Sequence, residues 1–276
     1  MAGMALLLVG FSFKVAAAPF HFWAPDVYQG APSPVTGWMA SIAKAAGFAA
    51  FLRVFFGAFG AHNADWSPVV AVLAFLTLVT GAVMAILQTD VKRMLAFSSI
   101  SHAGYVLVAV QSTADGGTSA ALFYLFTYTF MVLGSFAIIG AMGADGEHPL
   151  DRYAGLGRSR PVLAMAFTIL LLAQAGVPLT SGFVGKFQVI AAAVGHGSYL
   201  LAAVAMLSAV IGAFMYLRIV MTMYVVDDGT EGPSPTLHWT VAIVLIGTVG
   251  FTLLVGIVPQ FLIEFAEDAV PVLIRG

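Results

Sequence analysis

Apolar segments long enough to cross a lipid bilayer follow one another along almost the whole chain. A helix needs about 20 such residues to span the hydrocarbon core. The expected spans are 1–18, 34–57, 67–88, 93–111, 117–141, 161–194, 199–225 and 238–258. A tail at 260–273 mixes apolar and acidic residues and is expected to lie along the membrane interface. The sequence therefore predicts an all-α integral membrane protein with about eight transmembrane helices.

The composition agrees and excludes several classes of function. Only 9% of the residues are charged and 61% are hydrophobic, whereas about a quarter of the residues of a soluble domain are charged. A net charge of -2 gives no basic surface for a nucleic-acid partner. The absence of cysteine excludes disulfides, thiolate metal sites and cysteine nucleophiles. The lipid bilayer is the expected environment.

Two of the predicted spans are irregular. The segment 161–194 is too long for one straight pass, and Gly176-Val177-Pro178 interrupts it, while the first span meets Pro19 soon after Lys14. Because proline removes a helical hydrogen bond, we expect helix breaks at Pro19 and Pro178. Broken helices in transporters often mark the transport site. A long tilted helix with a packing kink is the alternative, and the pattern alone does not choose between the two.

Basic residues gather in two of the connections between spans. Lys92 and Arg93 lie in one, and three arginines between 152 and 160 lie in the other. If every span crosses once, both connections face the same side, and the excess of basic residues marks that side as cytoplasmic.

The ionisable residues inside the spans are all bases, since every carboxylate falls in a loop, at a span end or in the tail. A charge at the bilayer centre costs about 2.5–3.5 kcal/mol on insertion scales. Lys14, Lys44 and Lys186 are therefore candidates for carrying protons, because a lysine can lose and regain a proton whereas arginine stays protonated. The alternative is that each lysine pairs with a carboxylate supplied from elsewhere.

His102 is a further candidate because it follows the hydroxyl-rich run Ser98-Ser99-Ile100-Ser101 near mid-membrane. Imidazole titrates near neutral pH and can join hydroxyls and water in a hydrogen-bonded wire. Alternatively, the His102 imidazole has no relay role and only donates a hydrogen bond to a neighbouring backbone carbonyl. Arg53 is expected to make a structural pairing, and the role of Arg218 stays open. The sequence has no metal-ligand spacing, phosphate loop, nucleophile–base set or redox cofactor motif.

Four runs resemble a known family. FKVAAAPFHFWAPDVY (13–28), APSPVT (31–36), DVKRMLAFSSISHAGY (90–105) and GVPLTSGFVGKF (176–187) are similar to the antiporter-like, proton-conducting membrane subunits of respiratory complex I, or NADH-quinone oxidoreductase. The third and fourth runs look most like subunit N. In the sister subunit M, an acidic residue takes the place of Lys186.

The resemblance implies an antiporter-like fold of two inverted halves, each with a broken helix. Lys14 would lie on the first broken helix and Lys44 on the next, His102 on a connecting helix, and Lys186 on the second broken helix. Members of the family have nearly twice as many spans, so this chain corresponds to their C-terminal portion. The missing N-terminal helices, including one whose glutamate is expected to pair with Lys14, would come from a longer chain or another chain.

The same resemblance implies how the chain is organised. It would form a single membrane domain over 1–276, with 1–57 ending the first half, 67–225 forming the second half, and 238–276 holding the last helix and the interfacial tail.

The expected function is proton translocation in the cell inner membrane, with Lys14, Lys44, His102 and Lys186 as a relay. The expected partners are the other membrane-arm subunits of complex I. NADH, FMN, iron–sulfur clusters and quinone would bind in partner subunits, and no cofactor is expected in this chain. Two alternatives stay open. One is a subunit of a cation/proton antiporter, and the other is a structural module of the membrane arm that does not pump.

Overall fold

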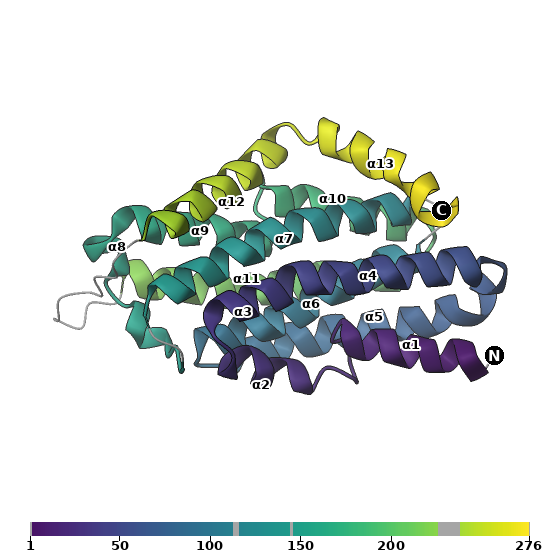
Figure 1. Ribbon diagram of the computed structural model, residues 1–276, viewed down its shortest axis with the longest axis horizontal. Helices are drawn as coiled ribbons and strands as arrows, with labels where there is room; N and C mark the ends of the chain where they lie inside the picture. Colours follow the sequence, from purple (N-terminus) through teal and green to yellow (C-terminus); the bar gives the residue numbers. More distant parts are fainter. Residues whose placement is uncertain (1, 113–115, 144–145, 226–237, 276) are drawn as a thin grey trace.

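The computed structural model describes residues 2–112, 116–143, 146–225 and 238–275, and these form a bundle of helices (Figure 1). The longer elements, in chain order, are α1 (Ala2–Lys14), α2 (Trp23–Gly30), α3 (Ser33–Trp38), η1 (Met39–Ala43), α4 (Lys44–Leu52), η2 (Arg53–Ala58), α5 (Asn63–Ile86), α6 (Val91–Gln111), α7 (Gly117–Ala141), α9 (Pro161–Ala175), α10 (Ser181–Gly195), α11 (Tyr199–Tyr224), α12 (Trp239–Ile257) and α13 (Gln260–Arg275). Short connecting helices are η3 (Gly60–His62), η5 (Leu150–Tyr153) and α8 (Leu156–Ser159).

The prediction of an all-α membrane protein with broken helices is confirmed. Six stretches of the described helices are long and apolar enough to cross a membrane. Two further pairs, α1 with α2 and α9 with α10, follow one another along the bundle as interrupted helices (Figure 1). If each interrupted pair also crosses once, the described residues make eight crossings, the number that the apolar segments predict.

One expected loop is partly helical. The connection at 19–33, where Pro25-Asp26 and the stretch from Gly30 to Pro34 indicate turns, contains the helix α2 over 23–30. Its apolar face is buried through Ala24 and Tyr28. A short helix with one buried face is missed by a search for continuous apolar runs, since its mean hydropathy is low. The first crossing therefore extends beyond the predicted 1–18.

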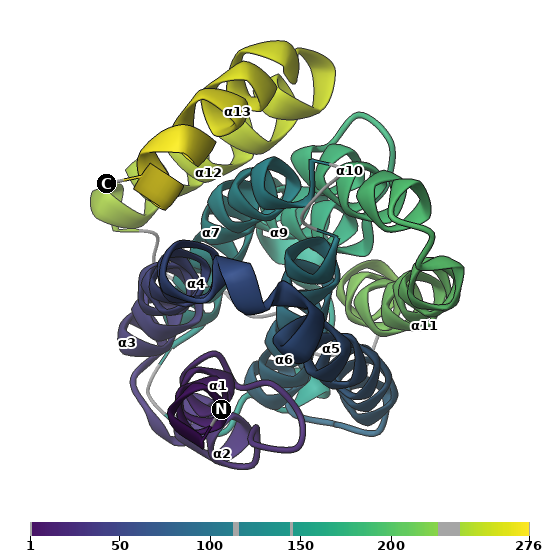
Figure 2. The ribbon, with the colours of Figure 1, turned by 90° about the vertical axis from the view of Figure 1, so that its right-hand side faces the viewer.

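Helix α6 forms the centre of the bundle, and its apolar stretch is completely buried. Figure 2, viewed along the bundle, shows other helices around it. Small residues allow α5 to approach it closely, because a side chain at Gly81 would meet Ser101 and one at Gly104 would meet Leu78. This central helix also carries the polar run that follows Phe97.

Three connections meet at one end of the bundle. The Val91 N–H donates to the His148 carbonyl at 2.8 Å, and the Leu150 N–H donates to the Thr89 carbonyl at 2.9 Å. The Lys92 ammonium reaches back to the Ala31 carbonyl at 2.6 Å. The basic connections around Lys92 and after His148 therefore lie on the same side, as their spacing in the sequence predicts.

The last two helices lie at the edge of the bundle (Figures 1 and 2). α13 packs on α7, where Leu262 and Ala266 are buried beside Phe123. Its placement along the membrane interface stays a prediction.

Candidate functional site

One face of α6 carries three polar side chains at successive helical turns. Ser99, His102 and Tyr105 are three residues apart, so their side chains lie above one another. All three are buried. Because burying a polar group without a partner costs free energy, each of them needs neighbours from other helices.

Lys44 meets this face at Ser99. Its ammonium donates to the Ser99 carbonyl oxygen at 2.8 Å and also contacts the Ser99 hydroxyl. The side chain is 4% exposed. Lys44 opens α4 directly after the π-helical turn η1, and such turns frequently occur at functional sites.

His102 is held at both ring nitrogens by tyrosines from two different helices. Nδ1 lies 2.7 Å from the hydroxyl of Tyr124 on α7, and Nε2 lies 3.0 Å from the hydroxyl of Tyr216 on α11. The Tyr216 hydroxyl also contacts the Ser98 hydroxyl. A neutral imidazole has one donor and one acceptor nitrogen, so the two phenols must differ in their roles. The arrangement forms a wire of four groups that can each donate and accept a proton.

Lys186 caps the first half of the interrupted helix. Its ammonium donates to the carbonyl oxygens of Gln174 and Ala175, each at 2.8 Å. These are carbonyls at the end of α9, where no further helical turn donates to them and the helix dipole favours a cation. The Lys186 ammonium also lies 5.0 Å from the centre of the Tyr105 ring.

The break between α9 and α10 permits this contact. Gly176 has φ 93°, a left-handed conformation that ends α9. An added Cβ at Gly176 would lie 2.9 Å from Cδ of Lys186, so glycine is needed for both conformation and space. Pro178 follows, and then Leu179 at φ 69°. A non-glycine residue in that region is strained by about 1–3 kcal/mol.

The first interruption has a similar backbone. α1 ends at Lys14, and Ala16 has φ 60° before Pro19. The Ala18 N–H in this interruption donates to the Thr77 hydroxyl at 3.0 Å. Both interruptions thus contain one non-glycine residue in the left-handed region.

Lys44, Ser99, His102, Tyr105 and Lys186 form a line of buried groups along α6, which we call the buried line. The structure does not bring Lys14 into it. Its side chain is exposed, and its stem lies against Gly47, where an added Cβ would be 3.3 Å from Cγ of Lys14. Lys44, His102 and Lys186 are brought together along α6, whereas Lys14 lies on the outside of the same group of helices.

A small cavity of about 10 Å³ adjoins the buried line between His102 and Lys186. His102, Lys186, Tyr216 and Ser98 contribute to its wall. The volume is roughly the minimum needed for one water molecule, and the wall offers several polar partners. A water there would bridge groups for which the structure gives no direct hydrogen bond.

The two arginines inside the predicted spans lie outside the buried line. Arg218 donates to the carbonyls of Ile86 and Gln88 at 3.2 and 3.1 Å, so it caps the end of α5. Arg53 is exposed on η2. Within the described ranges, no group of three or more histidine, cysteine or acidic residues lies close enough to hold a metal ion.

Sequence reasoning missed the tyrosines. Tyr124, Tyr128 and Tyr216 look like ordinary aromatic residues of apolar helices, yet all three surround His102. A usable signal was their position, because tyrosines of membrane helices favour the interface and these lie well inside their spans.

Comparison with known proteins gives the family. Residues 1–212, well over half of the chain, match the family described as "NADH:quinone oxidoreductase/Mrp antiporter, TM". The chain belongs to this family.

Relatives within the NADH:quinone oxidoreductase/Mrp antiporter family are similar over nearly all of this chain. NADH-quinone oxidoreductase subunit N of Salinispora arenicola is 48% identical over 97% of the chain and 52% of its own length. Subunit N of Trichlorobacter lovleyi is 46% identical over 97% of the chain and 55% of its own length. The chain therefore spans about half the length of the relatives it matches.

Solved structures agree. A chain of respiratory complex I from Thermus thermophilus with bound aureothin has a TM-score of 0.83 and 35% identity, covering 94% of this chain and 57% of that one. A chain of the Mrp complex from Dietzia sp. has a TM-score of 0.89 at 24% identity, covering 96% and 58%, which shows a shared fold.

Proposed function

We propose that this chain supplies a proton-translocating part of subunit N of an NADH-quinone oxidoreductase in the cell inner membrane. The observation that carries the proposal is the buried line along α6, in which Lys44 contacts Ser99, His102 bonds two tyrosines, and Lys186 lies against Tyr105. Every member except the Tyr105 ring can donate or accept a proton. The similarity to subunit N relatives supports the same assignment.

Electrostatics would couple the members of this line. Lys44 contacts Ser99 and Lys186 lies against Tyr105, so the two ammonium groups lie about one helical turn to either side of His102 on α6. In a buried site a charge is felt more strongly than in water, so adding a proton to one group opposes protonation of the next. A change in charge at one end would therefore propagate as proton transfers along α6.

Lys14 would join the relay through helices that this chain does not contain. Its exposed side chain lies beside Gly47 and outside the buried line. The family resemblance supplies a glutamate partner for it, from a longer chain or a neighbouring one. The two interruptions, each with a left-handed residue, support an assignment of 1–57 and 67–225 to two related halves.

The complete assembly would carry the redox chemistry elsewhere. NADH, FMN, iron–sulfur clusters and quinone would bind in partner subunits, and the other membrane-arm subunits would be the direct neighbours. Under this proposal, electron transfer in those subunits changes the charge next to the membrane arm, and the line along α6 answers by moving protons from the cytoplasm to the outside.

The first test is Lys186→Ala in the whole assembly, measuring proton pumping and NADH:quinone turnover in membrane vesicles. We expect both to be lost while the assembly persists. Lys186→Arg should keep the positive charge at the end of α9 and still abolish pumping, because arginine does not release its proton. Wild-type pumping by Lys186→Ala would refute the relay and favour a structural module.

Lys92 provides a matched control. It is a fully buried lysine of α6, bonded to the Ala31 carbonyl and lying outside the line. Lys92→Arg should leave pumping near the wild-type level, whereas Lys44→Arg should abolish it. Purification of the assembly distinguishes the antiporter alternative, because flavin and iron–sulfur subunits should accompany an oxidoreductase subunit and not an antiporter subunit.

A further inference from the structure

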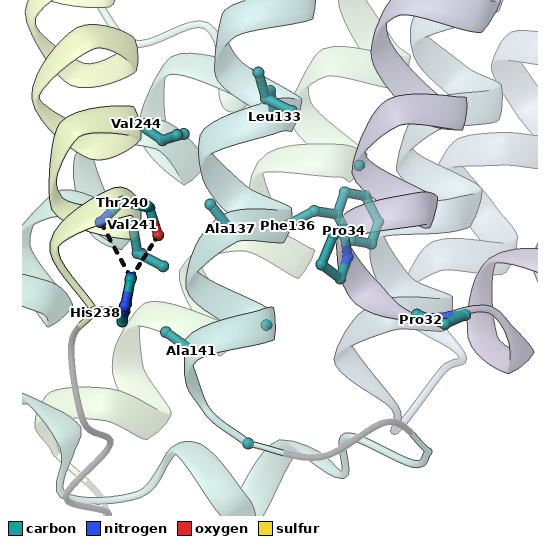
Figure 3. A pocket seen from close by; sticks show the side chains of 13 residues that line it. Pro32, Pro34, Leu133, Phe136, Ala137, Ala141, His238, Thr240, Val241 and Val244 are labelled. Carbon is teal, nitrogen blue, oxygen red and sulfur yellow. Dashed lines mark hydrogen bonds between the residues drawn. The ribbon is translucent and has the colours of Figure 1, made fainter.

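A large groove lies apart from the buried line, on the opposite side of α7. It is about 710 Å³ in volume, within the roughly 300–1,000 Å³ of small-molecule sites. Helices α3, α7 and α12 form its walls (Figure 3). The residues that shape it most are Pro34, Leu133, Phe136, Ala137, Ala141 and Val244.

Small residues of α7 make the hollow. Ala137, Gly140 and Ala141 line one wall, and their short side chains leave space between α7 and α12. On the other wall α3 approaches closely, because an added Cβ at Gly140 would lie 3.5 Å from Cβ of Ser33. The groove therefore has a floor where α3 and α7 touch and an apolar wall on α12.

The groove matches one leaflet of a bilayer in length. Leu133 and Ala141 are eight positions apart on the α7 wall, which is about 12 Å at 1.5 Å per residue. Half of the hydrocarbon core is about 15 Å. One end of the groove, its mouth, lies near His238, and the other lies near Leu133 (Figure 3). An acyl chain of a lipid has this length and this apolar character.

The mouth of the groove carries a cation. An added Cβ at Gly143, a lining residue, would lie 2.7 Å from Nη2 of Arg152. Arg152 donates to the carbonyls of Met142 and Glu147 at 2.9 and 3.4 Å. In the part of the chain that the structure describes, Arg152 forms no ion pair with a carboxylate. Its guanidinium has five N–H donors, so donors are left for an anion.

Further interfacial groups surround the same mouth. His238 and Thr240 line it and bond to each other at 2.9 Å, and Trp239 between them is 67% exposed. Tryptophan is enriched at the level of lipid headgroups. The mouth thus combines a guanidinium, polar donors and an interfacial aromatic residue, directly above an apolar groove.

We propose that this groove binds an anionic phospholipid, with one acyl chain along α7 and the headgroup phosphate at Arg152. A guanidinium suits phosphate through paired, charge-assisted hydrogen bonds. The apolar length below the cation fits an amphiphile, and the mouth lies at the end of the bundle where the basic connections meet. The site is independent of the proton relay.

The test uses a photoactivatable phosphatidylglycerol, with the reactive group near the end of its acyl chain, added to membranes that hold the complete assembly. Crosslinks should map to the region of Leu133 and Val244. Arg152→Ala should reduce the crosslinking about fivefold, which corresponds to the roughly 1 kcal/mol of one basic residue near anionic lipid. Ala137→Phe should reduce it further by filling the groove.

Two variants serve as matched controls. Arg160→Ala removes another arginine of the same connection, which lies directly before α9, and Ala71→Phe enlarges a partly buried alanine on α5. Both should keep wild-type crosslinking. Equal labelling by a phosphatidylcholine analogue, or labelling that Ala137→Phe leaves unchanged, would overturn the proposal. A photoreactive residue at Ala141 that crosslinks to polypeptide instead of lipid would also overturn it.

Discussion

At the scale of single residues, His102 depends on two phenol groups. Tyr216 bonds its Nε2 at 3.0 Å and contacts the Ser98 hydroxyl on the far side. Tyr216→Phe keeps the ring and removes this bridge. We expect proton pumping to fall about tenfold or more, since positioned proton-transfer groups contribute factors of about a hundred or more. Pumping would be measured in vesicles at equal amounts of assembly.

Tyr105→Phe is the matched control for this prediction. The Tyr105 hydroxyl donates its one hydrogen to the Ala205 carbonyl at 2.6 Å, and not to a side chain of the line along α6. Its loss should cost about 0.5–1.5 kcal/mol of stability and leave pumping nearly unchanged. If the two variants pump equally, the bridge at Tyr216 carries no protons.

The lysines were predictable as unusual residues and the tyrosines were not. Lys44 and Lys186 stand out because a cation within an apolar span is costly and needs a reason. Tyr124 and Tyr216 come from helices distant in sequence, and only the packing of α7 and α11 around α6 brings their hydroxyls to His102. The exposed setting of Lys14 was equally hidden, because the sequence does not show which face of α1 packs against the other helices.

At the scale of elements, the break between α9 and α10 depends on glycine. Gly176→Ala should cost about 1–2 kcal/mol for a left-handed alanine. It should also abolish pumping, because the new methyl group would lie only 2.9 Å from Cδ of Lys186 and would displace that side chain. Thermal unfolding in detergent and pumping in vesicles measure the two effects separately.

Gly197→Ala separates the conformational cost from the effect on Lys186. Gly197 has φ 79° just after α10, and an added Cβ would meet nothing within 4 Å. It should therefore lose similar stability and keep pumping. Loss of pumping in both variants would show that lower stability alone explains the effect at Gly176.

The start of α6 gives a second prediction at this scale. Asp90 caps the helix by accepting from the Arg93 N–H at 2.9 Å, and it also accepts from the His148 N–H at 2.5 Å. Asp90→Ala should destabilise the protein by about 1–2 kcal/mol or more, because it removes both the cap and the tie to the neighbouring connection. Asp151→Ala, an exposed acidic residue of that connection, should change the unfolding temperature little.

The length of the apolar segment and the position of its proline predicted the second interrupted helix. The segment 161–194 was too long for one pass, and it contains α9 and α10 with Pro178 between them. The turn η1 was not predictable, because a π-helical turn depends on how Lys44 packs against α6 and leaves no mark in a single sequence. The helix α2 was missed for its polar residues, although its buried face follows the usual amphipathic rule.

At the scale of the whole molecule, eight crossings would place the basic connections on one side of the membrane. Glu147 is exposed beside them, and Ala61 is exposed at the other end of the 24-residue helix α5, about 36 Å away. The chain has no cysteine, so single cysteines can be added without removing others. We expect a membrane-impermeant maleimide to label Glu147→Cys from the cytoplasmic side and Ala61→Cys from the outside.

The same labelling tests whether the first interrupted pair crosses the membrane. Gly3 and Gly30 lie at opposite ends of the pair formed by α1 and α2, and an added Cβ at either position would meet nothing within 4 Å. Gly30→Cys should label together with Glu147→Cys, because the adjacent Ala31 carbonyl accepts from Lys92 at that end. Gly3→Cys should label together with Ala61→Cys. Labelling of Gly3 and Gly30 from one side would reduce the number of crossings and place Lys14 and Lys44 at the wrong depth for a shared relay.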